Sequence, residues 1–419
     1  MSEKVNVKPY MPLVGAAGIG SMLGSGIIIG LSATITVWQK GLGLTDSQVG
    51  ILSGGLTFAI AAGSMLAGTI TKRVGLIRAF DYMNVLYAIG AVLCVLSGNF
   101  PVLLGGMILI GFASGADLPI SLTVVSRDAA DDKTSASLVA LTQVCWQFGA
   151  LASYVMAFIV AKIEGTLGAR IVFGILGGLA VIAFLWRSFS RNVKALHAVG
   201  ERFRAAEGTE ETKEISFTKI ISGKGNGKYL SFFLCITIFY VCWNLLSNTF
   251  GQFQTYILVK ANASQALATG VGVVLCIVGL LFGIVFAFLA GSKNRNKFFY
   301  VGIVIQAAAM IGMAIGSESV FMIVAMIALY NFGTPFAGET MYKIWTQESF
   351  PLEARASVQG FINGFSRFCC GVFAVVTPML VTAERIQMTM VGFAGIVVVS
   401  AVAGTIMIRL QKKYGVGQM

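Results

Sequence analysis

Charged residues are scarce in this sequence, and their scarcity excludes most classes of soluble protein. Asp, Glu, Lys and Arg make up 11% of the 419 residues, whereas apolar residues make up 56%. A soluble globular protein carries about 25% charged residues. The composition therefore excludes an ordinary soluble enzyme and a disordered protein, and it predicts a chain solvated mostly by lipid. The 50 glycines agree with this prediction, because Gly is frequent in membrane helices.

The sequence also lacks the residue groups that hold metals, disulfides or nucleotides. It contains a single histidine, His197, and its seven cysteines lie inside apolar runs without CxxC spacing. No GxxxxGK(S/T) phosphate loop is present, so ATP is not the expected energy source. We therefore expect no metal site and no cofactor, and we interpret His197 as an ordinary loop residue.

Long apolar runs dominate what is present. A membrane-spanning helix needs about 20 largely apolar residues. Twelve such runs lie at 12–38, 48–71, 79–98, 101–125, 136–162, 169–188, 229–259, 265–290, 298–316, 319–345, 356–383 and 388–408. The one long polar stretch, from Arg187 to Lys228, separates the sixth run from the seventh, and its nine basic residues are counted with the loops. The sequence thus predicts an all-helical membrane protein with an N-terminal six-helix bundle (1–188), a cytoplasmic loop (189–228) and a C-terminal six-helix bundle (229–419).

The net charge of +12 indicates orientation rather than binding to nucleic acid. If both termini and the central loop share one side of the membrane, that side holds 23 of the 30 Lys and Arg residues, and the opposite loops hold 5. Cytoplasmic loops are enriched in Lys and Arg. We therefore expect a multi-pass protein of the inner or plasma membrane with both termini cytoplasmic. The short loops leave no room for a folded receptor or enzyme domain, so we expect no enzyme.

The two halves of the chain share a short motif. Residues 128–138 align with residues 348–358 at a shift of 220, and both segments follow the fourth span of their half. Parallel six-helix repeats with a binding site at their interface are a transporter architecture. The repeat therefore favours a transporter built of two pseudo-repeats.

Three segments carry a resemblance to a known family. The loop at 68–78 resembles the signature loop of the major facilitator superfamily, although Lys72 stands where that family usually has an Asp. Residues 348–355 look like the second-half signature of its sugar and metabolite transporters, and residues 111–119 resemble the span-four motif of its metabolite:proton symporters. The resemblance implies that fold, a monomer, and gating or signature-loop roles for Gly68, Arg73, Gly75, Arg78, Asp81, Asp128, Glu348 and Arg355.

Few charges lie inside the predicted spans, and each one needs a reason because charge is costly in lipid. No charged residue lies between Lys8 and Lys40, so the span-one carboxylate of many sugar:proton symporters is missing. Asp117 in the fourth span either fixes helix packing or exchanges a proton. Glu339 can likewise be structural or exchange a proton. Lys343, one turn away on the same helix, can neutralise its charge. Asp81 near the start of the third span can pair with Arg78. The proton-coupling candidates are Asp117 and Glu339.

Amide and aromatic side chains recur every four residues on three predicted spans, which places them in stripes along the helices. Such groups must face protein or a wet cavity, because unpaired amides are costly in lipid. They either join helices or bind a solute. The candidate substrate-binding residues are Gln143, Trp146, Gln147, Tyr240, Trp243, Asn244, Asn248, Gln252, Gln254, Tyr256, Asn363 and Arg367, and Gln359 extends the last stripe.

The residue types in these stripes indicate the kind of solute. Amides donate and accept hydrogen bonds, which suits hydroxyl groups, and aromatic rings suit the C–H face of a sugar. Arg367 keeps a sugar acid open, because a guanidinium also binds a carboxylate. The family resemblance adds Gln143, Asn248, Gln252 and Gln254 as positions near the sugar-binding residues of sugar porters.

The first hypothesis is a proton-coupled symporter of a sugar, polyol or sugar acid that works by alternating access. Its partners would be the solute, protons and the lipid bilayer, with no nucleic acid. An uncoupled facilitator, or an exporter of drugs or metabolites, is the alternative on the same fold. An exporter should have a mainly apolar cavity, whereas these stripes are rich in amides. A third possibility is a sensor on this fold, which should carry a long signalling tail.

Overall fold

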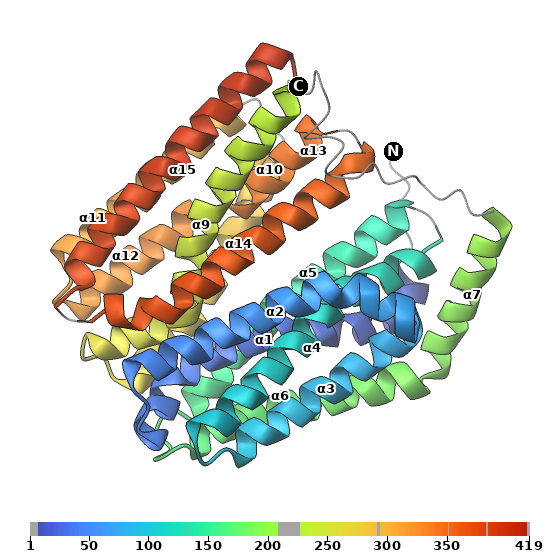
Figure 1. Ribbon diagram of the computed structural model, residues 1–419, viewed down its shortest axis with the longest axis horizontal. Helices are drawn as coiled ribbons and strands as arrows, with labels where there is room; N and C mark the ends of the chain where they lie inside the picture. The colour runs from blue at the N-terminus through green and yellow to red at the C-terminus, as the bar shows by residue number, and fades with distance from the viewer. Residues whose placement is uncertain are drawn as a thin grey trace. The chain divides into compact units, whose positions relative to one another are not determined.

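The computed structural model describes residues 7–130, 132–207, 227–290, 294–350, 352–382 and 384–416. Every regular element within these ranges is a helix (Figure 1). The backbone of a helix satisfies its own hydrogen bonds, which a chain in lipid requires. The chain divides into two compact units, Met1–Glu211 and Thr212–Met419. The predicted all-helical membrane fold is thereby confirmed.

The first unit contains six long apolar helices. They are α1 (Met11–Leu42), α2 (Asp46–Val74), α3 (Leu76–Leu96), α4 (Phe100–Asp128), α5 (Asp132–Ile159) and α6 (Leu167–Phe189). Each has a stretch long and apolar enough to cross a membrane. A short 3-10 turn (Lys8–Tyr10) precedes them, and α7 (Arg191–Glu207) follows them. In this unit α4 packs mainly on α2 and α3, and α1 packs mainly on α5 and α6.

Glycines let α2 and α4 approach each other closely. A Cβ atom on Gly115 of α4 would overlap the backbone of Ile60 in α2, and one on Gly63 of α2 would overlap the carbonyl of Phe112. Small residues permit such backbone contact between membrane helices. This contact sets the position of α4, and therefore of its polar side chains, along α2.

The link between α1 and α2 shows how the sequence ends one helix and starts the next. Gly43 follows α1 with φ 64°, a left-handed conformation that glycine adopts easily. Thr45 then caps α2. Its hydroxyl accepts a hydrogen bond from the backbone N–H of Gln48 (3.2 Å), and the Gln48 side chain accepts one from the Thr45 N–H (2.9 Å).

The second unit contains the remaining helices. They are α9 (Gly227–Lys260), α10 (Gln265–Ala290), α11 (Arg295–Ile315), α12 (Val320–Gly333), α13 (Glu339–Ser349), α14 (Leu352–Leu380) and α15 (Ile386–Tyr414). Among the described residues of both units, eleven helices are long and apolar enough to span a membrane. In this unit α9 packs on α14 and α15, and also on α13.

The predicted span at 319–345 differs from the expectation, because it consists of two helices. The shorter apolar helix α12 ends at Gly333, and α13 begins at Glu339. Pro335 lies in the break and has no N–H to continue a helix. The buried side chain of Gln306 in α11 donates hydrogen bonds to the carbonyls of Gly333 (3.3 Å) and Ala337 (3.1 Å). A neighbouring helix therefore satisfies carbonyls that the break releases.

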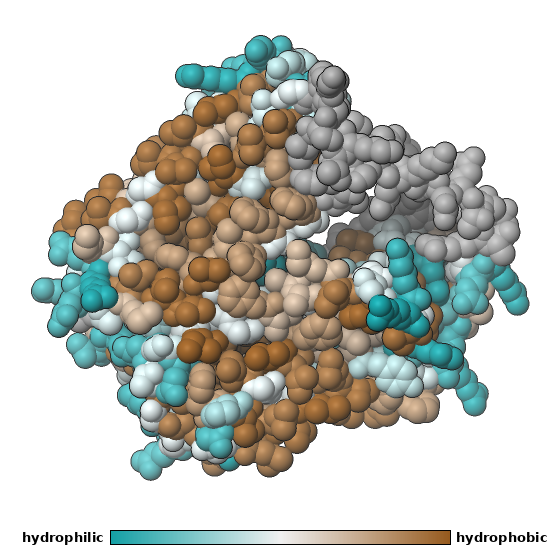
Figure 2. Space-filling view, viewed as in Figure 1, coloured by the Kyte–Doolittle hydropathy of each residue, from teal (hydrophilic) through white to brown (hydrophobic). Residues whose placement is uncertain are grey.

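The surface of the units matches a lipid environment. On the visible face, apolar residues cover the sides of the helices and hydrophilic residues gather near the helix ends (Figure 2). Large apolar side chains are exposed along these helices, as at Ile89, Val92 and Leu96 of α3. Soluble monomers rarely expose continuous apolar surface on this scale. The exposed surface therefore supports the membrane assignment made from composition.

Candidate functional site

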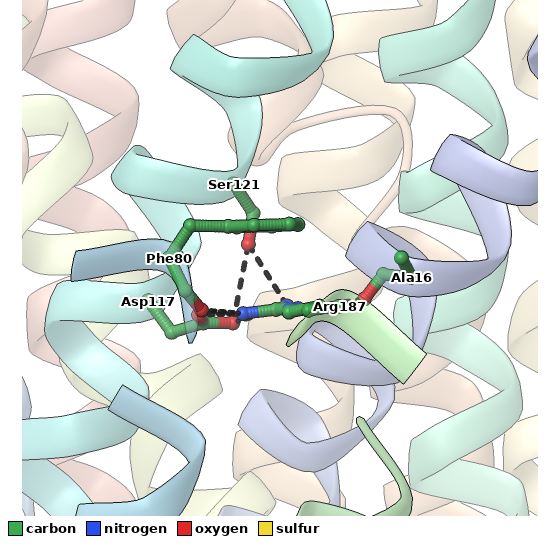
Figure 3. Close-up of polar contacts among 5 residues, drawn as sticks. All are labelled: Ala16, Phe80, Asp117, Ser121 and Arg187. Carbon is green, nitrogen blue, oxygen red and sulfur yellow. Dashed lines mark hydrogen bonds and ion pairs between the residues drawn. The ribbon is translucent and has the colours of Figure 1, made fainter. Parts of the chain in front are cut away.

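A buried ion pair joins α4 and α6 of the first unit (Figure 3). Asp117 of α4 is 4% exposed, and Arg187 in the last turn of α6 is 1% exposed. The Arg187 Nη1 atom lies 2.5 Å from Asp117 Oδ1, and Nη2 lies 3.1 Å from Oδ2. The two side chains thus meet in the bidentate arrangement that makes arginine–carboxylate pairs strong.

The other donors of Arg187 reach two further helices. Its Nε donates to the carbonyl of Ala16 in α1 (3.0 Å), and Nη1 donates to the carbonyl of Phe80 in α3 (2.5 Å). Ser121 of α4 accepts from Nη2 (3.2 Å), and its hydroxyl donates to Asp117 Oδ2 (3.2 Å). The guanidinium also lies 3.7 Å from the centre of the Phe80 ring. One side chain therefore connects α1, α3, α4 and α6.

This pair changes how two sequence predictions are read. The topology count placed Arg187 at the start of the polar stretch, but the structure places it inside α6 and buries it. Asp117 was a proton-coupling candidate without a known partner, and a proton can reach it only by competing with Arg187. The sequence reasoning missed Arg187 and Ser121. Their only signal was a lone arginine at the end of the sixth apolar run.

A second buried cluster lies where α4 ends. Asp128 is fully buried, accepts a hydrogen bond from Arg127 Nε (2.7 Å) and contacts Nδ1 of His197 on α7. The His197 ring meets the Phe80 ring edge-on, with centroids 6.2 Å apart. Gly200, one turn further along α7, packs so close that a Cβ there would overlap Asp128. The interpretation of His197 as an ordinary loop residue was therefore wrong.

Residues 68–78, which resemble the family's signature loop, include the junction of α2 and α3. Gly68, Arg73, Gly75 and Arg78 are all exposed, and Gly75 has φ 96° at the junction of the two helices. The predicted Arg78–Asp81 pair does not form. Within the described part of the chain, Asp81 has no ion pair, and its buried Oδ1 atom has no hydrogen-bond partner.

The corresponding acid of the second unit is also held by neighbouring helices. Glu348 of α13 binds Arg295 of α11 through both carboxylate oxygens (2.7 and 2.9 Å) and accepts from Gln411 of α15 (3.0 Å). Arg355 donates to the carbonyl of Phe350 (2.9 Å). Asp128 and Glu348, which are 220 residues apart, thus each anchor a basic side chain at the same point of their repeat.

Aromatic rings gather where α9, α13 and α14 meet. Tyr240 of α9 stacks on Tyr342 of α13 with ring centroids 3.9 Å apart, and Trp243 stacks on Tyr240 at 5.7 Å. The Tyr342 hydroxyl donates to the carbonyl of Gln359 in α14 (2.9 Å). The indole N–H of Trp243 is buried and has no hydrogen-bond partner among the described residues. Tyr342, which the sequence reasoning missed, is part of this aromatic cluster.

Amide and charged side chains lie beside the aromatic cluster and further along α9. Asn244 Nδ2 donates to Ser366 Oγ of α14 (2.6 Å), and Gln252 Nε2 donates to Asn248 Oδ1 (3.0 Å). Glu339 and Lys343 pair at 2.9 Å, with side chains 49% and 48% exposed. Glu339 and Lys343 therefore pair on one face of α13, as the sequence predicts.

Not every predicted binding residue shares this location. A helix rises about 1.5 Å per residue, so Tyr256 lies about 24 Å along α9 from Tyr240, too far for one small solute to touch both. Gln254 lies near that far end and is buried. The fifth-span residues Gln143 and Gln147 are exposed on α5 of the first unit. The ring of Trp146, also on α5, lies against Gly24 of α1.

Comparison with known proteins places the chain among transporters. Residues 14–375 match the sequence profile of the Major Facilitator Superfamily. The minor myo-inositol transporter IolF of Bacillus subtilis is 27% identical, covering 93% of this chain and 88% of that protein. The glucose transporter GlcP of Staphylococcus epidermidis is 23% identical, covering 79% and 78%. A crystal structure of a D-xylose–proton symporter has a TM-score of 0.77 at 15% identity, covering 94% and 96%, and shares the fold.

Proposed function

The chain belongs to the major facilitator superfamily, and on that premise we propose that it carries a sugar, polyol or sugar acid across the membrane together with protons. Its relatives are transporters of sugars, polyols and metabolites, so the chain is a transporter and not an enzyme. In the proposed cycle the two units alternately open the solute site to either side of the membrane.

The aromatic cluster of the second unit is the observation that carries this proposal. Tyr240 stacks on both Tyr342 and Trp243 in a buried cluster at one helix crossing, and Asn244 lies one turn from Tyr240. Ring faces suit the C–H surface of a sugar or cyclic polyol, and an amide suits its hydroxyls. The break between α12 and α13 lies beside the cluster, because Gly338 abuts the Trp243 indole. Interrupted membrane helices commonly line transporter sites.

The names of the relatives support a polyhydroxylated solute. Two of them are described as transporters of myo-inositol and of glucose. Both solutes carry several hydroxyl groups, which are the groups that the Asn and Gln side chains of α9 are suited to bind. The same chemistry argues against a drug exporter, whose site should be mainly apolar.

Proton coupling is proposed for Asp117 or Glu339. Asp117 faces Arg187, so its protonation would release a guanidinium that connects four helices. Glu339 pairs with the half-exposed Lys343 and lies one turn before Tyr342 of the aromatic cluster on α13. Protonation at Glu339 would therefore act directly beside the proposed solute site, whereas protonation at Asp117 would act through helix packing.

Transport by reconstituted protein tests the proposal. Proteoliposomes with an acidic exterior would be offered hexoses, polyols and sugar acids as separate pools. We expect uptake above the external concentration that an uncoupler abolishes. Uptake that stops at equal concentrations would identify the uncoupled facilitator instead. Uptake of none of the pools would contradict the solute class.

The remaining features of the proposal concern topology and assembly. We propose that the cytoplasmic side holds both termini, because it then also holds most of the Lys and Arg residues. We also propose that one chain is the working unit, as the family resemblance implies. A C-terminal fluorescent fusion, bright only in the cytoplasm, and a mass measurement in detergent would check these two points.

A further inference from the structure

An arginine in the second unit lies deep within a membrane span. Arg367 is part of α14, whose segment Val358–Leu380 is apolar enough to cross a membrane. From the rise of a helix, Arg367 is about 14 Å or more from either end of that segment. Charged side chains at such a depth are rare and usually face a partner or a watery cavity. We therefore expect Arg367 to face either a partner of opposite charge or a watery cavity.

The described part of the second unit offers Arg367 no such partner. Two of its acids are already paired, Glu339 with Lys343 and Glu348 with Arg295. Glu318 and Glu384 lie at helix ends, where they line one pocket. Glu353 precedes Arg367 by fourteen residues on the same helix, a rise of about 21 Å. Among the described residues, the Arg367 guanidinium makes neither an ion pair nor a hydrogen bond.

The position of Arg367 on α14 also separates it from the apolar side of that helix. Large apolar residues are exposed along one side, namely Phe361, Phe365, Phe368, Val372, Val376 and Met379. Each residue turns a helix by about 100°, so Gln359, Asn363 and Arg367 lie on the opposite side. Arg367 therefore points away from the side that suits lipid.

On that opposite side Arg367 lies near the aromatic cluster. Tyr342 of the cluster donates to the carbonyl of Gln359, two turns before Arg367 on α14. Ser366, its neighbour in sequence, accepts the hydrogen bond from Asn244. The charges of Glu339 and Lys343 cancel. Together with Arg367, these three side chains carry one net positive charge. A neutral sugar would leave this charge uncompensated, whereas one carboxylate would balance it.

We propose that the solute is an anionic sugar acid and that Arg367 binds its carboxylate. This inference rests on the proposed transport function and narrows its solute class. The guanidinium can hold a carboxylate through two parallel hydrogen bonds. Tyr240 and Trp243 would contact the carbon skeleton, while neighbouring amides would bind the hydroxyls. Arg367 thus becomes the residue that selects acids over neutral sugars.

Matched solutes test this selection. Reconstituted full-length protein would be given radiolabelled D-glucuronate or D-glucose, and D-gluconate or sorbitol, pairs that differ by a carboxylate. We expect half-saturation for each acid at a concentration at least about tenfold lower than for its neutral partner, the factor expected from one hydrogen bond to a charged group. Arg367→Gln should abolish that preference, and Arg367→Lys should keep part of it, because it keeps the charge but loses the fork.

The same substitution elsewhere provides the control. Arg409 is exposed near the end of α15, and Arg409→Gln should leave the preference for acids unchanged. The inference is overturned if glucose and sorbitol reach half-saturation at the same concentrations as the acids, or if Arg367→Gln keeps the preference for acids. The transport proposal stands in either case. If no hexose, polyol or sugar acid is carried, both are overturned.

Thermal unfolding separates a ligand-binding arginine from a structural one without any transport assay. Without solute, Arg367→Gln should unfold at the same or a higher temperature than the wild type, because the guanidinium makes no hydrogen bond or ion pair with the described residues. D-gluconate should raise the unfolding temperature of the wild type but not of Arg367→Gln. A lower unfolding temperature for the solute-free variant would assign Arg367 a structural role and overturn the inference.

Discussion

At the scale of single residues, the two units use an arginine inside a span in opposite ways. Arg187 gives its donors to Asp117, Ser121 and two backbone carbonyls. Arg367 has no hydrogen-bond partner among the described residues of its unit. The first arginine is therefore expected to stabilise the fold, and the second is expected to serve a ligand. Residue type and hydropathy do not distinguish these cases, because the difference lies in what surrounds each side chain.

Removal of Arg187 should destabilise the first unit. Arg187→Gln leaves Asp117 buried without its cation, and breaking a buried pair from one side typically costs about 3–5 kcal/mol. We expect a clearly lower unfolding temperature in detergent, with Arg409→Gln as the control that leaves it unchanged. Adding Asp117→Asn to Arg187→Gln should recover part of the loss. An unaltered unfolding temperature in the single variant would contradict the role given to this pair.

The identity of the coupling acid can be decided by separating accumulation from exchange. Replacing the coupling acid with the neutral amide should abolish uptake against a gradient and retain solute exchange, because an amide cannot take up the transported proton. Asp117→Asn and Glu339→Gln are the matched variants for this measurement. If both variants still accumulate solute, neither acid carries the proton.

Asn248 provides a test of the amide stripe on α9. Asn248→Ala removes a side chain that accepts from Gln252 and is proposed to bind a solute hydroxyl. We expect affinity to fall by about tenfold, which corresponds to about 1.4 kcal/mol, one lost hydrogen bond. Competition uptake measures this directly. Unchanged affinity would remove Asn248 from the solute site.

The sequence predicts which side chains are unusual at this scale, but not their partners. Asp117 and Arg367 are conspicuous because charge is rare in apolar runs. Arg187 is not conspicuous, because it lies at the border of a run and resembles a loop residue. Its partner is 70 positions away in sequence, and only the packing of α4 against α6 brings the two together.

At the scale of helices, the broken tenth span shows what an apolar run conceals. Residues 319–345 are apolar enough to predict one span, yet the chain forms α12 and α13. Pro335 in sequence marks a weak point in the helix. The break also needs Gln306, which lies on a different helix and satisfies the carbonyls of Gly333 and Ala337. A sequence pattern read along one span cannot include that contribution.

Replacement of Gln306 by an apolar residue of similar length should weaken the break. Gln306→Met removes the donor to the Ala337 carbonyl, and a buried unsatisfied group costs about 1–3 kcal/mol; the Gly333 carbonyl keeps its backbone donor from Phe336. We expect a lower unfolding temperature and faster hydrogen exchange at residues 334–338. Val304→Ala, an exposed position on the same helix, is the control and should change stability by less than about 0.5 kcal/mol. Equal stability of Gln306→Met and wild type would contradict this role.

At the scale of the whole molecule, the architecture was the easiest part to predict. Lipid requires apolar runs of a certain length, so hydropathy alone locates nearly every span. The internal repeat at a shift of 220 residues predicts two related halves, and each half forms its own compact unit. The acids of this repeat, Asp128 and Glu348, each anchor a basic side chain of another helix. The repeated acids thus both contact other helices, although the helices and the partner residues differ.

The attachment of α7 to the end of α4 has a practical consequence. His197 and Gly200 pack directly on the buried Asp128, so α7 must follow any displacement of α4. A spin label on the exposed side of α7 would therefore report the motion of the first unit from outside the apolar spans. Paired with a second label on α15, it would let pulsed electron resonance follow transport in real membranes while the solute site stays chemically untouched.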